Sequence, residues 1–156
     1  MNKVMLEALR FQNPANNGMP MMLVKDSKIG NYNLKANDEL IINYQGVQKL
    51  ATQWQRPQEF LPDRFDSEDP LYLTPSGEKR HHYVFVPFSG GKRICFGKSF
   101  AEATMKMTLT YLTQYFNFEH ADACFGKDTD LYPQAHFGVS CRGFEPIHVI
   151  LTENKE

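Results

Sequence analysis

Residues 88–97 read FSGGKRICFG. Cys95 stands two residues before Gly97, where a helical pattern of apolar residues begins. Glycines let the backbone approach a flat or bulky group, and a helix start favours a thiolate through its amides and dipole. Arg93 adds a fixed positive charge nearby. The stretch therefore predicts a cysteine held as an anion on a tight loop, which is what a thiolate metal ligand needs.

Two other interpretations of these residues stay open at this point. A single cysteine beside a helix is usually a small buried hydrophobic residue. The tripeptide Gly97-Lys98-Ser99, between an apolar run and a helix, matches the end of a P-loop. That motif needs a glycine where this chain has Lys92, so a nucleotide-hydrolysing enzyme is disfavoured.

Two further motifs precede the cysteine stretch. Residues 7–10 read EALR, an i,i+3 pair of opposite charges that is usually a solvated helix face. Residues 54–65 read WQRPQEFLPDRF, a run of aromatic, proline and arginine positions. The pattern Phe-x-x-Gly-x-Arg-x-Cys-x-Gly in the cysteine stretch has five fixed positions, which chance would match in roughly one in tens of thousands of chains this long.

Taken together, these motifs resemble those of the cytochrome P450 family, in which a cysteine thiolate binds the haem iron. The resemblance implies that Cys95 is the iron ligand and the catalytic residue of a site for haem b. It also implies that Phe88, Gly91, Arg93 and Gly97 are the other cofactor-binding positions of the loop. Arg93 is the preferred partner of a haem propionate, because a guanidinium can bind a carboxylate through two hydrogen bonds.

The resemblance further implies a buried structural network of Glu7, Arg10 and Arg64. Two guanidiniums and one carboxylate can satisfy each other's hydrogen bonds and tie the first helix to the later loop. One departure from the family lies nearby, because members often have histidine six residues before the tryptophan of the second motif, and this chain has Gln48. A second candidate for a propionate contact is Lys25.

The expected fold is a C-terminal fragment of the cytochrome P450 fold. It is α+β, with helices and small antiparallel sheets, although the parent fold is mainly α. Residues 1–156 form one partial domain in this interpretation, without the N-terminal helices and without the distal helix used in oxygen activation. Patterns along the chain predict a helix at residues 2–11 and short strands at 21–24, 32–34 and 40–42, with candidate turns at Gly30-Asn31 and Asn37-Asp38 between them. A long loop is predicted at residues 55–83, a buried helix at 97–116 and a last strand at 147–151.

The resemblance implies a monooxygenase that oxidises a small apolar substrate with O2. Electrons would come from a redox partner such as an NADPH-dependent reductase, with Lys92 and Lys98 as candidate docking contacts. Residues 15–23 and 137–144 are expected to line the substrate pocket, and this chain alone is expected to be inactive. One alternative is a truncated, non-catalytic haem-binding fragment or pseudogene product. Another is a haem-thiolate isomerase or sensor.

The composition narrows the classes of protein to which the chain can belong. The chain has 156 residues, 42% hydrophobic and 22% charged, with a net charge of -1. These values predict a folded domain and give no electrostatic basis for binding nucleic acid. No run of residues is long and apolar enough for a membrane span, and no signal peptide is recognisable, so the chain as given is expected to be cytosolic. By resemblance, a complete parent would lie at the endoplasmic reticulum membrane, facing the cytosol.

The remaining cysteines and the adjacent histidines are expected to have no catalytic role. Three cysteines without CxxC spacing disfavour a disulfide framework or a zinc ribbon. Cys124 and Cys141 are therefore expected to be structural. His81 and His82 have no carboxylate or cysteine at ligand spacing, which favours exposure to solvent over a metal site.

Overall fold

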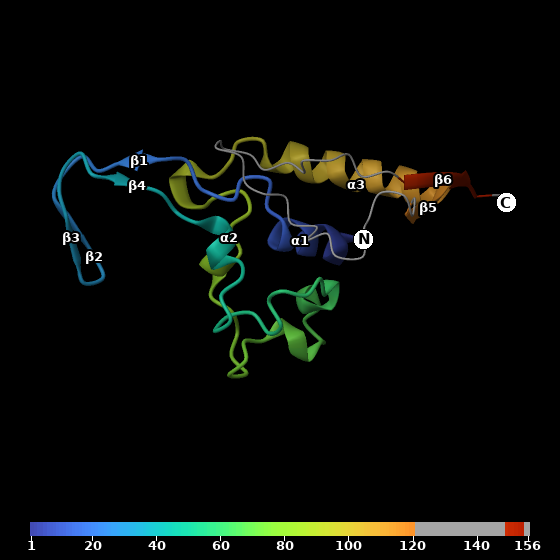
Figure 1. The fold of residues 1–156 in the computed structure, drawn as a ribbon, viewed down its shortest axis with the longest axis horizontal. Coiled ribbons are helices and arrows are strands. Elements are labelled where there is room, and N and C mark those ends of the chain that lie inside the picture. The colour runs from blue at the N-terminus through green and yellow to red at the C-terminus, as the bar shows by residue number, and fades with distance from the viewer. Residues whose placement is uncertain (121–148, 155–156) are drawn as a thin grey trace.

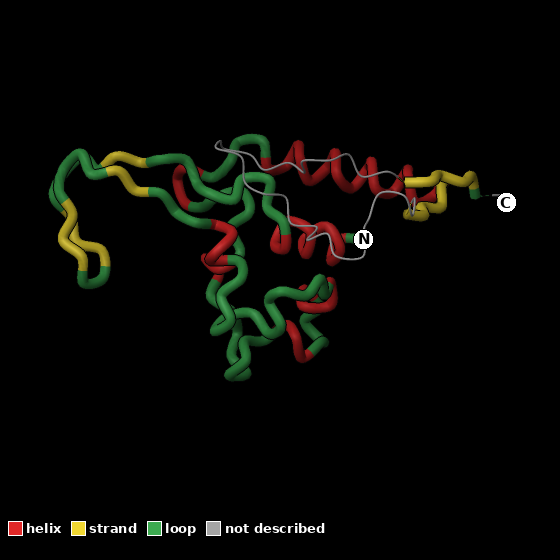
Figure 2. Tube along the Cα trace, viewed as in Figure 1, coloured by secondary structure: helices red, strands yellow, loops and turns green. Residues whose placement is uncertain are grey.

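The computed structural model describes residues 1–120 and 149–154. This part of the chain contains three α-helices, three two-stranded antiparallel sheets and four short 3-10 helices (Figures 1 and 2). The α-helices are α1 (Asn2–Phe11), α2 (Tyr44–Val47) and α3 (Lys98–Tyr115). The 3-10 helices are η1 (Pro62–Phe65), η2 (Pro70–Tyr72), η3 (His82–Val84) and η4 (Gly91–Arg93).

Helix α1 forms as its apolar spacing predicts. It buries Met5 and Leu9, while Val4 on another face stays exposed. Glu7 and Arg10 are also fully buried, although charged residues at this spacing usually face water. The helix therefore contributes a charged pair, as well as apolar side chains, to the interior.

A β-arm extends away from the helices (Figure 1). In it β1 (Met21–Met22) pairs with β4 (Glu39–Leu40), and β2 (Ser27–Ile29) pairs with β3 (Tyr32–Leu34). Gly30 and Asn37 adopt left-handed conformations, with φ of 57° and 71°, as the predicted turns require. The strand β2 was not predicted, because one apolar residue in three gives no alternation.

The long segment after α2 packs around Trp54, which is 1% exposed. Its indole ring lies 5.9 Å from the ring of Phe65 and 6.3 Å from that of Phe85, centre to centre. The rings of Phe65 and Phe85 lie 5.0 Å apart. Residues 55–83 were predicted as a long loop, and they fold into short 3-10 helices and turns. The aromatic cluster explains this, because it gives the segment a core to pack around.

Helix α3 occupies the predicted range and runs beside α1 (Figure 1), with Thr110 Oγ1 donating to Met1 Sδ at 3.0 Å. After it, β5 (Phe116–His120) pairs with β6 (Val149–Glu153). The expectation of a buried helix is wrong, because no residue of α3 is buried. One apolar stripe of α3 is half-buried. A second apolar face includes Phe100, which is 79% exposed, and Met107, which is 73% exposed. No element among the described residues covers this second face.

None of the helices within residues 1–120 and 149–154 is long and apolar enough to cross a membrane.

Candidate functional site

The backbone of the cysteine loop is closed by one main-chain hydrogen bond, from Cys95 N to Phe88 O at 2.9 Å. Between these residues, Ser89 and Gly91 both take the left-handed conformation, with φ of 63° and 65°. Glycine adopts it without strain, whereas serine does so at a cost. The turn leads through η4 into α3 (Figure 2). The position of Cys95 is therefore set by main-chain geometry.

The thiol of Cys95 is free and exposed. Its backbone carbonyl accepts a hydrogen bond from Lys98 N at 3.3 Å, at the start of α3. Within the described part of the chain no hydrogen bond reaches the sulfur, so the expected amide contacts to Sγ are not formed. A Cβ on Gly97 would lie 3.8 Å from Sγ, an ordinary contact. The sulfur is thus open to an incoming group.

Cys95 lies in the wall of a cavity of about 820 Å³, a volume typical of small-molecule sites. Arg93, Phe88 and Ser89 line the same cavity. Much of the remaining lining comes from residues 13–22, which include prolines and three methionines. The first segment predicted to contact substrate therefore borders the cavity that holds the cysteine. The second, residues 137–144, lies outside the described residues.

The residues of this cavity fit a haem. An accessible thiol is the ligand that a haem-thiolate site requires. Arg93 has no ion pair among the described residues, so its guanidinium is available to a carboxylate. The largely apolar wall suits a flat hydrophobic ring. Phe88 is half-buried, and Gly91 contributes its backbone conformation rather than space, because a Cβ there would meet nothing within 4 Å.

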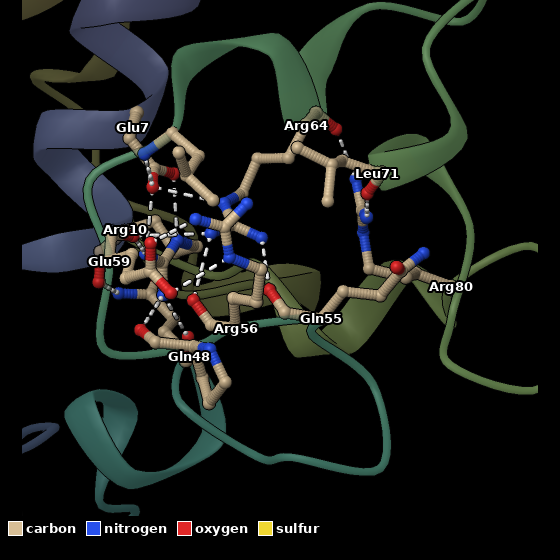
Figure 3. Close-up of polar contacts among 11 residues, drawn as sticks. Glu7, Arg10, Gln48, Gln55, Arg56, Glu59, Arg64, Leu71 and Arg80 are labelled. Carbon is tan, nitrogen blue, oxygen red and sulfur yellow. Dashed lines mark hydrogen bonds and ion pairs between the residues drawn. The ribbon is translucent and has the colours of Figure 1, made fainter.

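The structure brings Glu7, Arg10 and Arg64 into direct contact (Figure 3), and all three side chains are fully buried. Arg10 donates to the Glu7 carboxylate through Nε at 2.7 Å and Nη2 at 2.8 Å, a bidentate pair. Arg64 Nε donates to Oε1 of Glu7 at 2.9 Å. The backbone N–H of Leu61 donates to the same oxygen at 2.8 Å. One carboxylate therefore joins α1 to the segment around η1.

Backbone carbonyls satisfy the rest of the two guanidiniums. Arg10 donates to the carbonyls of Gln48, Pro57 and Glu59 at 3.1, 2.9 and 3.0 Å. Arg64 donates to three carbonyls of residues 55–59 at 2.7–3.1 Å. Burial lowers the pKa of Arg64, which the Glu7 carboxylate partly offsets. These contacts hold the loop that carries the second motif against α1.

Arg80 adds a third guanidinium, and it lies in none of the three sequence motifs. It donates to Arg64 O at 2.6 Å and Leu71 O at 2.7 Å (Figure 3). Its guanidinium lies 4.3 Å from the ring centre of Trp54. Burial, with the charge of Arg64, lowers the pKa of Arg80 to about 10. A stacked guanidinium over an indole is a favourable arrangement. No spacing in the sequence identifies it.

Gln48 is a second residue that the sequence interpretation missed, since it appeared there only as a departure from the family. Its side chain is fully buried. Nε2 donates to Leu9 O at 3.1 Å, and Oε1 accepts from Val86 N at 3.2 Å. Gln48 therefore connects the end of α1 to the residues that lead into the cysteine loop.

The other predicted positions lie apart from the cavity. Lys25 and Lys92 are exposed and neither lines it. His81 and His82 are exposed as expected, with their rings stacked 4.5 Å apart. The described residues contain no group of three potential metal-binding side chains. Cys124 and Cys141 fall outside the described residues.

Comparison with known proteins places these features in one family. The sequence model of the family Cytochrome P450 matches residues 1–131. Dihydroniloticin synthase CYP71CD4 of Ailanthus altissima is 32% identical over 152 residues, which cover 97% of this chain and 28% of that protein. Melianol synthase CYP71BQ5 of Azadirachta indica is 32% identical over 125 residues, or 80% of this chain and 23% of that protein. The chain thus spans about a quarter of the length of these curated relatives.

Solved structures show the same fold. A retinoic acid-bound cyanobacterial CYP120A1 superposes with a TM-score of 0.78 at 23% identity, over 98% of this chain and 32% of that one. A zebra fish cytochrome P450 structure with abiraterone gives a TM-score of 0.75 at 21% identity, over 99% of this chain and 33% of that one. The predicted fold is confirmed: the described elements correspond to about a third of such structures.

Proposed function

The chain belongs to the cytochrome P450 family, and we propose that it is the C-terminal, haem-binding part of a haem-thiolate monooxygenase. The observation that carries this proposal is the free, exposed thiol of Cys95 in the wall of a largely apolar cavity. Arg93 beside it offers a cation for the acidic edge of the cofactor. The similarity of the chain to members of the cytochrome P450 family supports this proposal.

Each residue of the loop has a distinct task in this proposal. Cys95 Sγ binds the iron as a thiolate, and Arg93 holds a propionate carboxylate through charge and hydrogen bonds. Phe88 accepts the closing hydrogen bond of the loop and contributes an apolar face to the cavity, while Gly91 supplies the left-handed turn. When bound, haem with a thiolate ligand supplies oxygen activation, because the thiolate donates electron density that favours O–O cleavage.

Glu7, Arg10 and Arg64 have a structural task in the same proposal. Their side chains are fully buried and do not line the cavity, so they do not touch the cofactor or substrate. They hold the segment around η1 on α1, and Gln48 carries the connection on to Val86. The cysteine loop follows from there. The network therefore supports the site by stabilising the part of the chain that leads into the cysteine loop.

An apolar substrate and a separate electron donor complete the proposed reaction. The methionines and prolines of residues 13–22 form an apolar wall without a fixed charge, which suits a hydrophobic organic molecule. Lys92 and Lys98 are candidate contacts for a reductase on the cysteine side. Oxidation by O2 needs two electrons, and NADPH through a reductase is the proposed source.

A second candidate function is a non-catalytic haem-binding fragment. The uncovered apolar face of α3 favours it, because Phe100, Met107 and Tyr111 are 79, 73 and 61% exposed. An apolar face of this kind normally packs against other elements. If no other polypeptide covers it, α3 lacks packing partners, and a loosely packed chain would not support oxidation. No feature of the described residues favours an isomerase or sensor.

The test compares cysteine variants in the full-length, haem-loaded protein that contains this chain. Cys95→Ala should abolish the thiolate-type absorption of the reduced, carbon-monoxide-bound haem, whereas Cys124→Ala and Cys141→Ala should keep it. Substrate-dependent NADPH consumption with a reductase, compared between the full-length protein and this chain alone, then separates a monooxygenase from a non-catalytic fragment. Retention of the thiolate signal in Cys95→Ala, or its loss in Cys124→Ala, would show that the ligand is assigned wrongly.

A further inference from the structure

Helix α2 and its C-cap residue, Gln48, contact the start of the cysteine loop through two buried side chains. Tyr44 Oη donates to Ser89 Oγ at 2.9 Å. Gln48 Oε1 accepts from Val86 N at 3.2 Å. Both contacts join α2 to the segment that leads into the Cys95 turn. About 40 residues of sequence separate the partners of each contact, and the aromatic cluster around Trp54 holds the intervening segment in place.

Tyr44 is itself held in one position. Its side chain is 8% exposed, and a Cβ on Gly18 would lie only 2.9 Å from its Cζ, so the ring packs directly on the Gly18 backbone. Asn43 caps α2 by accepting from Gly46 N at 2.7 Å. Because the ring is packed and the helix that carries it is capped, the Tyr44 hydroxyl is a hydrogen-bond donor in a fixed position.

Ser89 is the residue of the loop that needs such a partner. Its φ of 63° is left-handed, a region that non-glycine residues avoid because of their Cβ. Its N–H donates to Val86 O at 3.0 Å, which makes it part of the turn that precedes Gly91. A loop with a strained residue at its start needs a surrounding contact to select that conformation.

We propose that Tyr44 is a positioning residue for the cysteine ligand, an inference that rests on the proposed haem-thiolate function. Its hydroxyl holds Ser89 in the left-handed conformation, and this sets the path of the backbone to Cys95. Tyr44 and Ser89 both line the cavity that holds the thiol, so the contact lies at the site and not on a remote surface. Loss of the hydroxyl lets the loop leave the geometry in which the sulfur binds as a thiolate.

The experiment measures the ratio of non-thiolate to thiolate forms in the reduced, carbon-monoxide-bound, full-length protein. Tyr44→Phe removes only the donor and Ser89→Ala only the acceptor. Each should raise the ratio about threefold to tenfold, the equivalent of one net hydrogen bond, and the double variant should add little. Ser89→Gly adopts positive φ without strain, so it should restore a low ratio in the Tyr44→Phe background. Tyr32→Phe, at an exposed tyrosine of β3, is the matched control.

The outcomes separate the two proposals. If Cys95→Ala keeps the thiolate signal, the proposed function fails. If Cys95→Ala loses it but Tyr44→Phe matches Tyr32→Phe, the function stands and the positioning role is wrong. A Tyr44→Phe protein that unfolds at lower denaturant with an unchanged ratio of forms would also overturn the inference, because the tyrosine would then be structural alone.

Discussion

Replacing Glu7 with glutamine keeps the shape of the side chain but removes its charge from a fully buried cluster. The carboxylate accepts hydrogen bonds from Arg10 Nε and Nη2, Arg64 Nε and Leu61 N, at 2.7, 2.8, 2.9 and 2.8 Å. In Glu7→Gln one of the two oxygens becomes an NH2 donor that faces other donors. The two buried guanidiniums then lose the carboxylate with which both form ion pairs.

The size of the effect follows from these contacts. Hydrogen bonds to charged groups contribute about 1.5–3 kcal/mol each, so the four together set a generous upper bound. Both guanidiniums keep their bonds to backbone carbonyls, which reduces the loss. The expected destabilisation is about 3–5 kcal/mol, as for breaking a buried ion pair. A domain is stable by about 5–15 kcal/mol, so Glu7→Gln should sharply reduce folded, haem-retaining protein.

Denaturant unfolding of the full-length protein measures this change, with haem retention as a second readout. Glu59→Gln is the matched control, because Glu59 undergoes the same chemical change but pairs with Arg56 at the surface, where both side chains are at least half exposed. Solvent screening makes that pair weak, so its midpoint should hardly move. Equal shifts for the two variants, or strict additivity of Glu7→Gln with Arg10→Ala, would refute a coupled network.

Three further predictions concern residues around the site. Gln48→Leu leaves Val86 N and two carbonyls of α1 without partners and should lower the unfolding free energy by about 1–3 kcal/mol; an unchanged midpoint would contradict the bridging role. Gly18→Ala places a methyl group 2.9 Å from Tyr44 Cζ and should destabilise by about 1–3 kcal/mol in the same assay; a neutral result would mean that the ring moves freely. The isolated chain should bind a hydrophobic dye and aggregate, because one face of α3 is uncovered; a soluble chain with cooperative unfolding and substrate-dependent turnover would show that this face needs no further cover.

Short sequence patterns were sufficient to predict the elements that form from interactions between residues close together in the chain. Helices α1 and α3 follow from apolar residues at helical spacing, and the turns at Gly30 and Asn37 follow from residues that tolerate positive φ. The cysteine loop was recognisable because its backbone needs particular residue types at fixed spacing. Strand β2 was missed, since its pairing with β3 comes from the turn between them and not from its own side chains.

Tertiary structure alone decided which buried side chains meet. Glu7 and Arg64 stand 57 residues apart, so resemblance to the family, and not spacing, predicted their pairing. The burial of α3 was predicted wrongly because its sequence records an apolar surface but not whether another element covers it.

The contacts of Arg10, Arg80 and Gln48 with backbone groups could not be predicted from residue types. Most of their partners are backbone carbonyls and amides, such as those of Pro57, Leu71 and Val86. Every residue offers the same carbonyl group, so the sequence at the accepting position carries no signal. The amino-acid sequence thus determined the family, the helices and the cysteine loop. The fold decided which carbonyls meet the buried guanidiniums and which hydroxyl reaches Ser89, because only three-dimensional packing brings distant backbone groups within hydrogen-bonding distance.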